Sequence, residues 1–126
     1  MPDTNYVSYA DLEDLRLEGA RFEAPEPLLY DDTLKFSHVR NARVKRVYVV
    51  GGRENAIDLN RMCRDICIED STLKGGDQAT VVVKGGSESV IFDRVIHVPS
   101  PKAWCEFLIG DWSDQSNAKT RGVVVW

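Results

Sequence analysis

The chain has 126 residues, of which 43% are hydrophobic and 29% are charged, and its formal net charge is −4. This length suits a single domain, and no run of about 18 uninterrupted apolar residues predicts a membrane-spanning helix. The N-terminal segment 1–5 lacks the basic-then-apolar order of a signal peptide, so we expect synthesis in the cytoplasm and no membrane partner. The three cysteines, Cys63, Cys67 and Cys105, lack the spacing of a disulfide framework or a zinc site, and we expect no cofactor.

The charges are distributed unevenly along the chain. Residues 1–32 carry nine acids and two bases (net −7), residues 33–64 eight bases and two acids (net +6), and residues 65–126 nine acids and six bases (net −3). The middle segment is therefore a basic band in an acidic chain. The negative total, the confinement of this band and the lack of a helix-turn-helix or zinc signature argue against a nucleic-acid partner.

The start of the chain has an apolar residue at every fifth position: Val7, Leu12, Leu17 and Phe22. This pattern resembles pentapeptide-repeat proteins over about 20 residues and stops at Pro25. The resemblance implies an acidic mimic of nucleic acid, which five basic residues between positions 40 and 53 oppose. A capping helix from Ser8 is an alternative, although it would place Leu17 on the wrong face.

A repeat follows in the middle of the chain. A shift of 24 residues places Ile57 on Val81, Leu59 on Val83, Ile66 on Val90 and Ile68 on Phe92. Each copy reads apolar-x-apolar, a polar turn, then apolar-x-apolar, which is the alternation of a strand with one buried face. A shift of 19 residues back from Ile66 and Ile68 reaches the apolar pair Val47 and Val49, and a shift of 51 residues back reaches Leu15 and Leu17. A last pair of this kind, Val123 and Val125, lies at the end of the sequence.

These copies predict an all-β fold, a right-handed parallel β-helix of about five rungs that forms one domain over residues 1–126. The rungs begin near residues 15, 47, 66, 90 and 123. The predicted core consists of the alternating apolar side chains Leu15, Leu17, Val47, Val49, Ile57, Leu59, Ile66, Ile68, Val81, Val83, Val90 and Phe92.

Glycine pairs and prolines mark the predicted corners and loops. The pairs at 51–52, 75–76 and 85–86 follow strands, where a sharp turn requires positive φ. Two segments, Glu23–Thr33 and Pro99–Trp112, contain prolines that cannot enter a central ladder, so we expect two looped-out insertions. The last rung ends at Trp126 without a cap, which predicts either a fragment of a longer chain or an end covered by a second copy or another chain.

The segments Glu54–Leu59, Asp65–Leu73 and Gly75–Gln78 resemble the pectin-lyase-like superfamily, and in particular the polygalacturonase pattern N-T-D-G-I-D, a strand, then G-D-D. The resemblance implies hydrolysis by three aspartates. Carried over to this chain, the first falls on Asn55 and the third on Gln78, so Asp77 is the one catalytic candidate. A single carboxylate cannot serve as both acid and base.

The histidines and the remaining acids do not complete an active site. His97 aligns with Leu73 and His38 with Ile57, so we assign neither to catalysis. A calcium-dependent lyase would need several converging oxygens beside a base. The acids Asp70, Asp77, Asp93 and Asp111 with Arg94 have no spacing that requires such a site, and we interpret them as solvated.

Two groups of residues are candidate ligand sites. The first comprises the bases Arg43, Lys45, Arg61 and Arg64, which stacking could align into a ladder for uronate, sulfate or phosphate groups. Alternatively, these bases neutralise the acidic first rung or contact an acidic neighbour. The second group could offer a sugar one apolar face and several polar partners: Trp112, Asp111, Asp114, Gln115 and Asn117. Alternatively, Trp112 folds back over the coil.

The sequence therefore favours a non-enzymatic structural or adhesive β-helix module. Such a module resembles the spikes and fibres of phages and gene-transfer particles, and we expect it to bind an acidic surface polysaccharide as part of a virion or similar particle. The alternative is a polysaccharide hydrolase or lyase whose other catalytic groups lie outside this chain.

Overall fold

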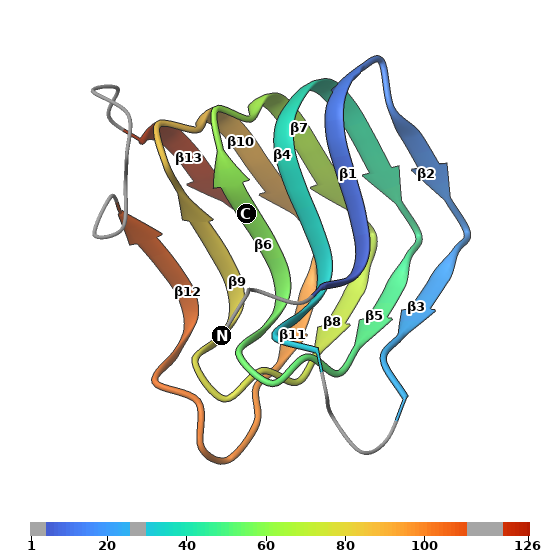
Figure 1. Cartoon of the computed structure of the whole chain (residues 1–126), viewed down its shortest axis with the longest axis vertical. Helices are drawn as coiled ribbons and strands as arrows, with labels where there is room; N and C mark the ends of the chain where they lie inside the picture. Colours follow the sequence, from blue (N-terminus) through green and yellow to red (C-terminus); the bar gives the residue numbers. More distant parts are fainter. Residues whose placement is uncertain (1–4, 26–29, 111–119) are drawn as a thin grey trace.

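The computed structural model describes residues 5–25, 30–110 and 120–126. All regular secondary structure in these ranges is β, and the thirteen strands pair in parallel. The chain winds as a solenoid of about four turns with up to three strands in each turn (Figure 1). This confirms the predicted all-β parallel coil. No helix in the described ranges is long and apolar enough to cross a membrane.

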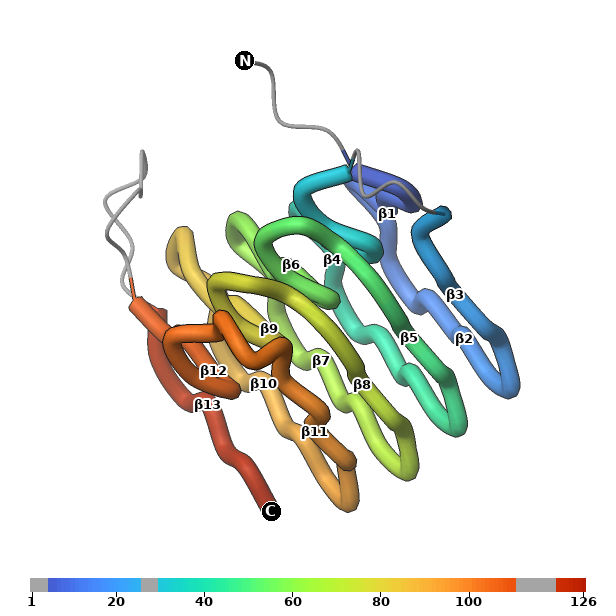
Figure 2. The backbone as a smooth tube through the Cα atoms, turned by 90° about the horizontal axis from the view of Figure 1, so that it is seen from below, coloured from blue at the N-terminus to red at the C-terminus, as the bar shows by residue number. Residues whose placement is uncertain are grey.

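The strands form three faces along the coil. The first face contains β1 (Asn5–Glu13), the first part of β4 (Asp32–Lys45), β6 (Asn55–Arg61), β9 (Ala79–Lys84) and β12 (Cys105–Gly110). The second contains β2 (Arg16–Glu18), the second part of β4, β7 (Arg64–Glu69), β10 (Glu88–Asp93) and β13 (Arg121–Val125). The third contains β3 (Arg21–Glu23), β5 (Tyr48–Val50), β8 (Thr72–Lys74) and β11 (Ile96–Val98). Figure 2 shows the turns lying one above another, with β1–β3 at one end and β11–β13 at the other.

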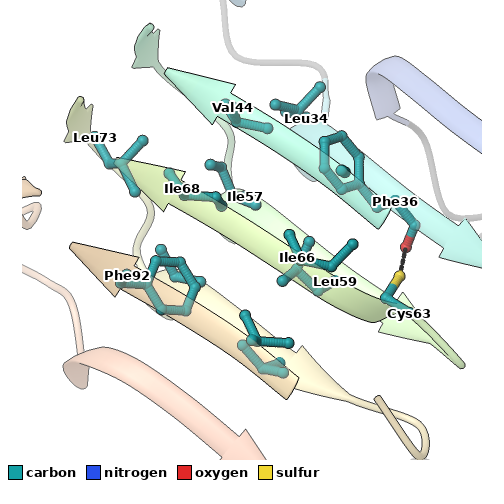
Figure 3. Close-up of a cluster of buried hydrophobic side chains, with 14 of the residues drawn as sticks. Leu34, Phe36, Val44, Ile57, Leu59, Cys63, Ile66, Ile68, Leu73 and Phe92 are labelled. Atoms are coloured by element: carbon teal, nitrogen blue, oxygen red, sulfur yellow. Dashed lines mark hydrogen bonds between the residues drawn. The ribbon is translucent and has the colours of Figure 1, made fainter. Parts of the chain in front are cut away.

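The core is a set of apolar columns, because parallel register places each inward side chain on its equivalent in the next turn (Figure 3). One column on the first face joins Leu34, Ile57 and Val81, whose side chains are fully buried. All the predicted core residues belong to this cluster or pack against it. Each fully buried side chain of this size contributes roughly 1.5–3 kcal/mol.

Glycines form the tight corners, as predicted. Both residues of each pair have positive φ. A Cβ at Gly76 would lie 2.1 Å from the carbonyl oxygen of Ala79, so no other residue fits that backbone. Buried serines complete two other corners: Ser71 Oγ accepts the Val47 N–H at 3.1 Å and donates to the Glu69 carbonyl at 2.8 Å.

The structure has about four turns where five rungs were predicted, and the pair Val47 and Val49 was assigned to the wrong face. Val49 lies on β5 in the third face, in register with Leu73. The partners of Ile66 and Ile68 in the preceding turn are Ala42 and Val44, 24 residues earlier. Alanine gives a weak hydrophobic signal, so the stretch 42–44 resembles a buried strand less than the stretch 47–49 does.

The predicted insertions are shorter than expected. The first connects β3 to β4 and spans residues 24–31, since Asp32 already belongs to β4. The second spans residues 99–104, because Cys105–Gly110 is the strand β12, paired with β9. The capping helix considered at Ser8 is wrong as well, since this residue lies in β1.

We expect Gly76→Ala to lower the free energy of unfolding by at least about 3 kcal/mol, because it adds a backbone collision to the strain of positive φ. Gly19→Ala is the matched control: φ is +68° at Gly19, but nothing lies within 4 Å of the added Cβ. Positive φ alone should cost about 1 kcal/mol there. Urea unfolding followed by circular dichroism measures both values. Equal losses would contradict a close approach at the corner.

Candidate functional site

A basic cluster lies on the outer side of the second face. It consists of Arg16 on β2 and of Arg43 and Lys45 on β4. Arg16 and Arg43 are register partners on adjacent strands, which lie about 4.8 Å apart. Lys45 follows Arg43 by two residues, so it projects from the same side of the strand about 7 Å further along. The coil thus brings together three bases that are up to 29 residues apart in the sequence.

Arg16 and Arg43 have no acid as a register partner, whereas Lys45 lies in register between Glu18 and Glu69, which are also bound to other bases. Glu18 pairs with Arg46, and Glu69 lies 3.8 Å from Arg94. Within the described ranges, no carboxylate lies within 4.0 Å of the charged nitrogens of the three cluster residues. Arg16 instead donates to the carbonyl oxygens of Leu15 and Asn41, at 2.9 and 3.0 Å, which fixes its guanidinium over the face.

Two shallow depressions flank Arg43. One, of about 130 Å³, is lined by the three cluster residues with Leu17, Glu18 and Glu69. The other, of about 250 Å³, extends over Cys67, Asp65 and Ser89. Burial, together with the negative charge of Glu69, raises the pKa of the Cys67 thiol. Cys67 therefore stays protonated at neutral pH and is a poor nucleophile.

The other two bases of the predicted ladder lie elsewhere. Arg64 is in register with Arg40 rather than Arg43, and Arg61 lies at the end of β6 on the first face. Arg64 is also neutralised, because its guanidinium lies 2.8 Å from Glu88. The four predicted bases therefore do not form one column, and Arg16 takes a place that the sequence analysis missed. The 27-residue offset from Arg16 to Arg43 differs from the 24-residue repeat, so the repeat does not identify this pairing.

Arg64 belongs to a column of charges that we call the ion ladder: Glu13, Arg40, Arg64, Glu88 and Arg121. Glu13 pairs with Arg40 at 3.4 Å, and Glu88 pairs with Arg121 at 2.6 Å as well as with Arg64. A hydrogen bond from Arg121 and the nearby Arg64 charge hold the pKa of Glu88 below its ordinary value. The ladder thus contains structural ion pairs between adjacent strands at every step except the one from Arg40 to Arg64, where two bases are register partners.

The positions suggested by the polygalacturonase resemblance do not form an acid-base pair. Asn55 is buried and donates from Nδ2 to Asp32 Oδ1 at 2.8 Å. Asp77 is exposed and accepts a hydrogen bond from Ser100 Oγ at 2.6 Å. Its neighbour Gln78 is only partly exposed and carries no acid.

Two of the four acids considered for a metal site form structural ion pairs. Asp70 and Asp93 both bind the Arg94 guanidinium, at 2.6 and 2.7 Å. Across residues 5–25, 30–110 and 120–126, no group of three or more His, Cys, Asp or Glu side chains could hold a metal ion. The predicted sugar site falls on 111–119, so Trp112, Asp111, Asp114, Gln115 and Asn117 lie outside the described residues.

The predicted alignment is confirmed for one histidine and wrong for the other. His97 is in register with Leu73, as predicted, and packs 4.3 Å from the Phe107 ring. Burial lowers the pKa of His97, so its imidazole is neutral at pH 7. The predicted alignment of His38 with Ile57 is wrong, because Leu34 is the register partner of Ile57. His38 lies at a corner with φ of 54° and lines a cavity of about 220 Å³ with Arg40, Met62 and Cys63.

The depressed pKa of Glu88 predicts acid sensitivity. A carboxyl whose pKa is lower in the folded state stabilises the fold above its unfolded value, near 4.5, and this contribution is lost as pH falls further. We expect Glu88→Gln to lower stability at neutral pH and to flatten its decline in acid, as measured by urea unfolding from pH 7 to pH 3. Glu106→Gln, an exposed change outside the ladder, should retain the wild-type slope. An unchanged slope in Glu88→Gln would contradict the ladder.

Comparison with known proteins gives no relative: no protein family, no curated protein and no solved structure matches this chain.

Proposed function

We propose that this chain is a non-enzymatic structural or adhesive β-helix module whose basic cluster binds an acidic polysaccharide. The observation that carries the proposal is the pair of adjacent positive charges at Arg16 and Arg43, which are register partners and have no acid as a register partner within the described ranges. Adjacent like charges repel each other, so an anion bound across them relieves a cost that the free protein bears.

The shape of the face favours an extended polymer over a small substrate. The two depressions beside Arg43 measure about 130 and 250 Å³, whereas enzyme and cofactor pockets have volumes of roughly 300–1,000 Å³. Uronate and sulfate groups repeat along a sugar chain and accept charge-assisted hydrogen bonds from arginine. Three cations spaced along a flat sheet suit such a series of anions.

The alternative, a polysaccharide hydrolase or lyase, has less support. Asp77 has an exposed carboxylate without a second acid at the positions of the resemblance, and the retaining and inverting mechanisms both need two. Membership of a virion or similar particle is a part of the proposal that rests on the resemblance of the coil alone.

The enzyme alternative is tested by measuring reducing ends released from polygalacturonate. We expect no release above the buffer background by the wild type, and none by Asp77→Asn. Release by the wild type that Asp77→Asn abolishes would overturn the non-enzymatic function and assign the alternative.

Binding is tested by titrating polygalacturonate into the protein in a calorimeter, with neutral dextran as the control ligand. We expect binding to the acidic polymer only, weakened by added salt because exposed charges are screened. Loss of one exposed ion pair costs about 1 kcal/mol, so Arg43→Ala should weaken binding about fivefold. Arg43→Ala combined with Lys45→Ala should weaken it further.

Lys74→Ala is the matched control for these variants. Lys74 is exposed on β8 in the third face, so its removal changes the net charge equally and leaves the cluster intact. Equal weakening by Lys74→Ala would show non-specific attraction, and wild-type binding by the double variant would refute the site.

A further inference from the structure

The two ends of the coil expose strands that are paired on one side only. At one end, β1 and β2 pair with β4, and β3 pairs with β5. At the other end, β11 pairs with β8, β12 with β9 and β13 with β10 (Figure 2). In the part of the chain that the structure describes, no strand lies beyond either set. Each end thus presents backbone N–H and C=O groups that can extend the parallel ladder.

The same inward columns reach both ends. On the first face, one column begins at Val7 and ends at Phe107, and the next begins at Tyr9 and ends at Ile109. On the second face, a column runs from Leu17 to Val125. The apolar side chains at the last turn are left partly open: Ile109 is 46% exposed and Val125 is 49% exposed.

The ends carry opposite charge. Residues 1–25 contain six acids and two bases (net −4), whereas residues 94–126 contain four bases and three acids (net +1). The ion ladder shows the same polarity, because it begins with Glu13 and ends with Arg121. Each end is therefore complementary to the opposite end of another copy.

We propose that copies of this chain associate head to tail, with β12 and β13 of one copy continuing the parallel ladder into β1 and β2 of the next. The first and second faces each carry five strands and the third carries four, so the ladder continues on those two faces. In this arrangement Phe107 packs on the partner's Val7, Val125 packs on the partner's Leu17, and Arg121 continues the ion ladder to the partner's Glu13. The contact joins two different surfaces and leaves one free end of each kind, so it produces open linear multimers rather than closed dimers.

Contacts between like ends are less favourable. A two-fold contact between two last turns would bring together two segments of net charge +1, and one between two first turns would join segments of net charge −4. Like-charge contacts cost free energy and exclude the wrong partner. Head-to-tail association satisfies both charge and the parallel ladder of the first and second faces.

Sedimentation velocity of the full chain across a wide concentration range tests the proposal. We expect the wild type to grow into a series of multimers as concentration rises. Arg121→Glu and Glu13→Arg place like charges at the contact, so each should weaken association roughly tenfold or more. An equimolar mixture of the two variants restores opposite charges at every junction, so the mixture should recover multimers that neither variant forms alone.

Two controls separate an effect at the head-to-tail contact from a general effect of charge or of unfolding. Lys74→Glu is the control, since it makes the same change of charge as Arg121→Glu on β8, in the third turn, and should leave association unchanged. Thermal unfolding followed by circular dichroism checks that each variant is folded. A wild type that stays monomeric throughout, a closed dimer, or a mixture of folded variants that does not recover multimers would overturn head-to-tail association.

Discussion

The parallel hydrogen-bond ladder between successive turns determines which side chains meet in this protein. Once the register is set, a residue 24 positions further along the middle of the chain takes the same place one turn later, as Ile57 and Val81 do. The corners obey the same constraint: a Cβ at Gly75 would lie 2.8 Å from the carbonyl oxygen of Gly51, its equivalent in the preceding turn. The ladder thus requires glycine at corners and apolar residues inside, because each turn must fit directly on the last.

On the outer side, the same register can either neutralise charge or concentrate it. The column through Glu13 and Arg40 and the pair Arg64 and Glu88 place opposite charges on adjacent strands. The column through Arg16 and Arg43 places like charges together. Exposed ion pairs contribute little individually, so the ion-paired column mainly fixes register, whereas the column through Arg16 and Arg43 is the part of the surface that an anion would stabilise.

The sequence predicts the interior better than the surface. Every core position predicted from the alternation belongs to the buried cluster or packs against it, and each predicted glycine pair forms a corner. Burial and positive φ restrict the choice of residue strongly, which is why these features can be predicted. Alternation alone does not say to which face a strand belongs, which is why Val47 and Val49 were placed beside Ile66 and Ile68. The first turn is offset by 27 residues rather than 24, so the pairing of Arg16 with Arg43 could not be found without the register. Neither burial nor positive φ restricts the charged residues of the surface, and which of them become neighbours depends on the number of residues between successive turns.

The periodicity that encloses the core also connects the two proposals. The second face carries five strands spaced about 4.8 Å apart, so head-to-tail copies would repeat the basic cluster roughly every 24 Å along this face. A polymeric anion lying along this face would contact several clusters at once, and each contact after the first would be intramolecular. Weak exposed ion pairs at a single cluster could then add up to firm attachment. A surface that binds little as one copy would bind an acidic polymer strongly as a stack.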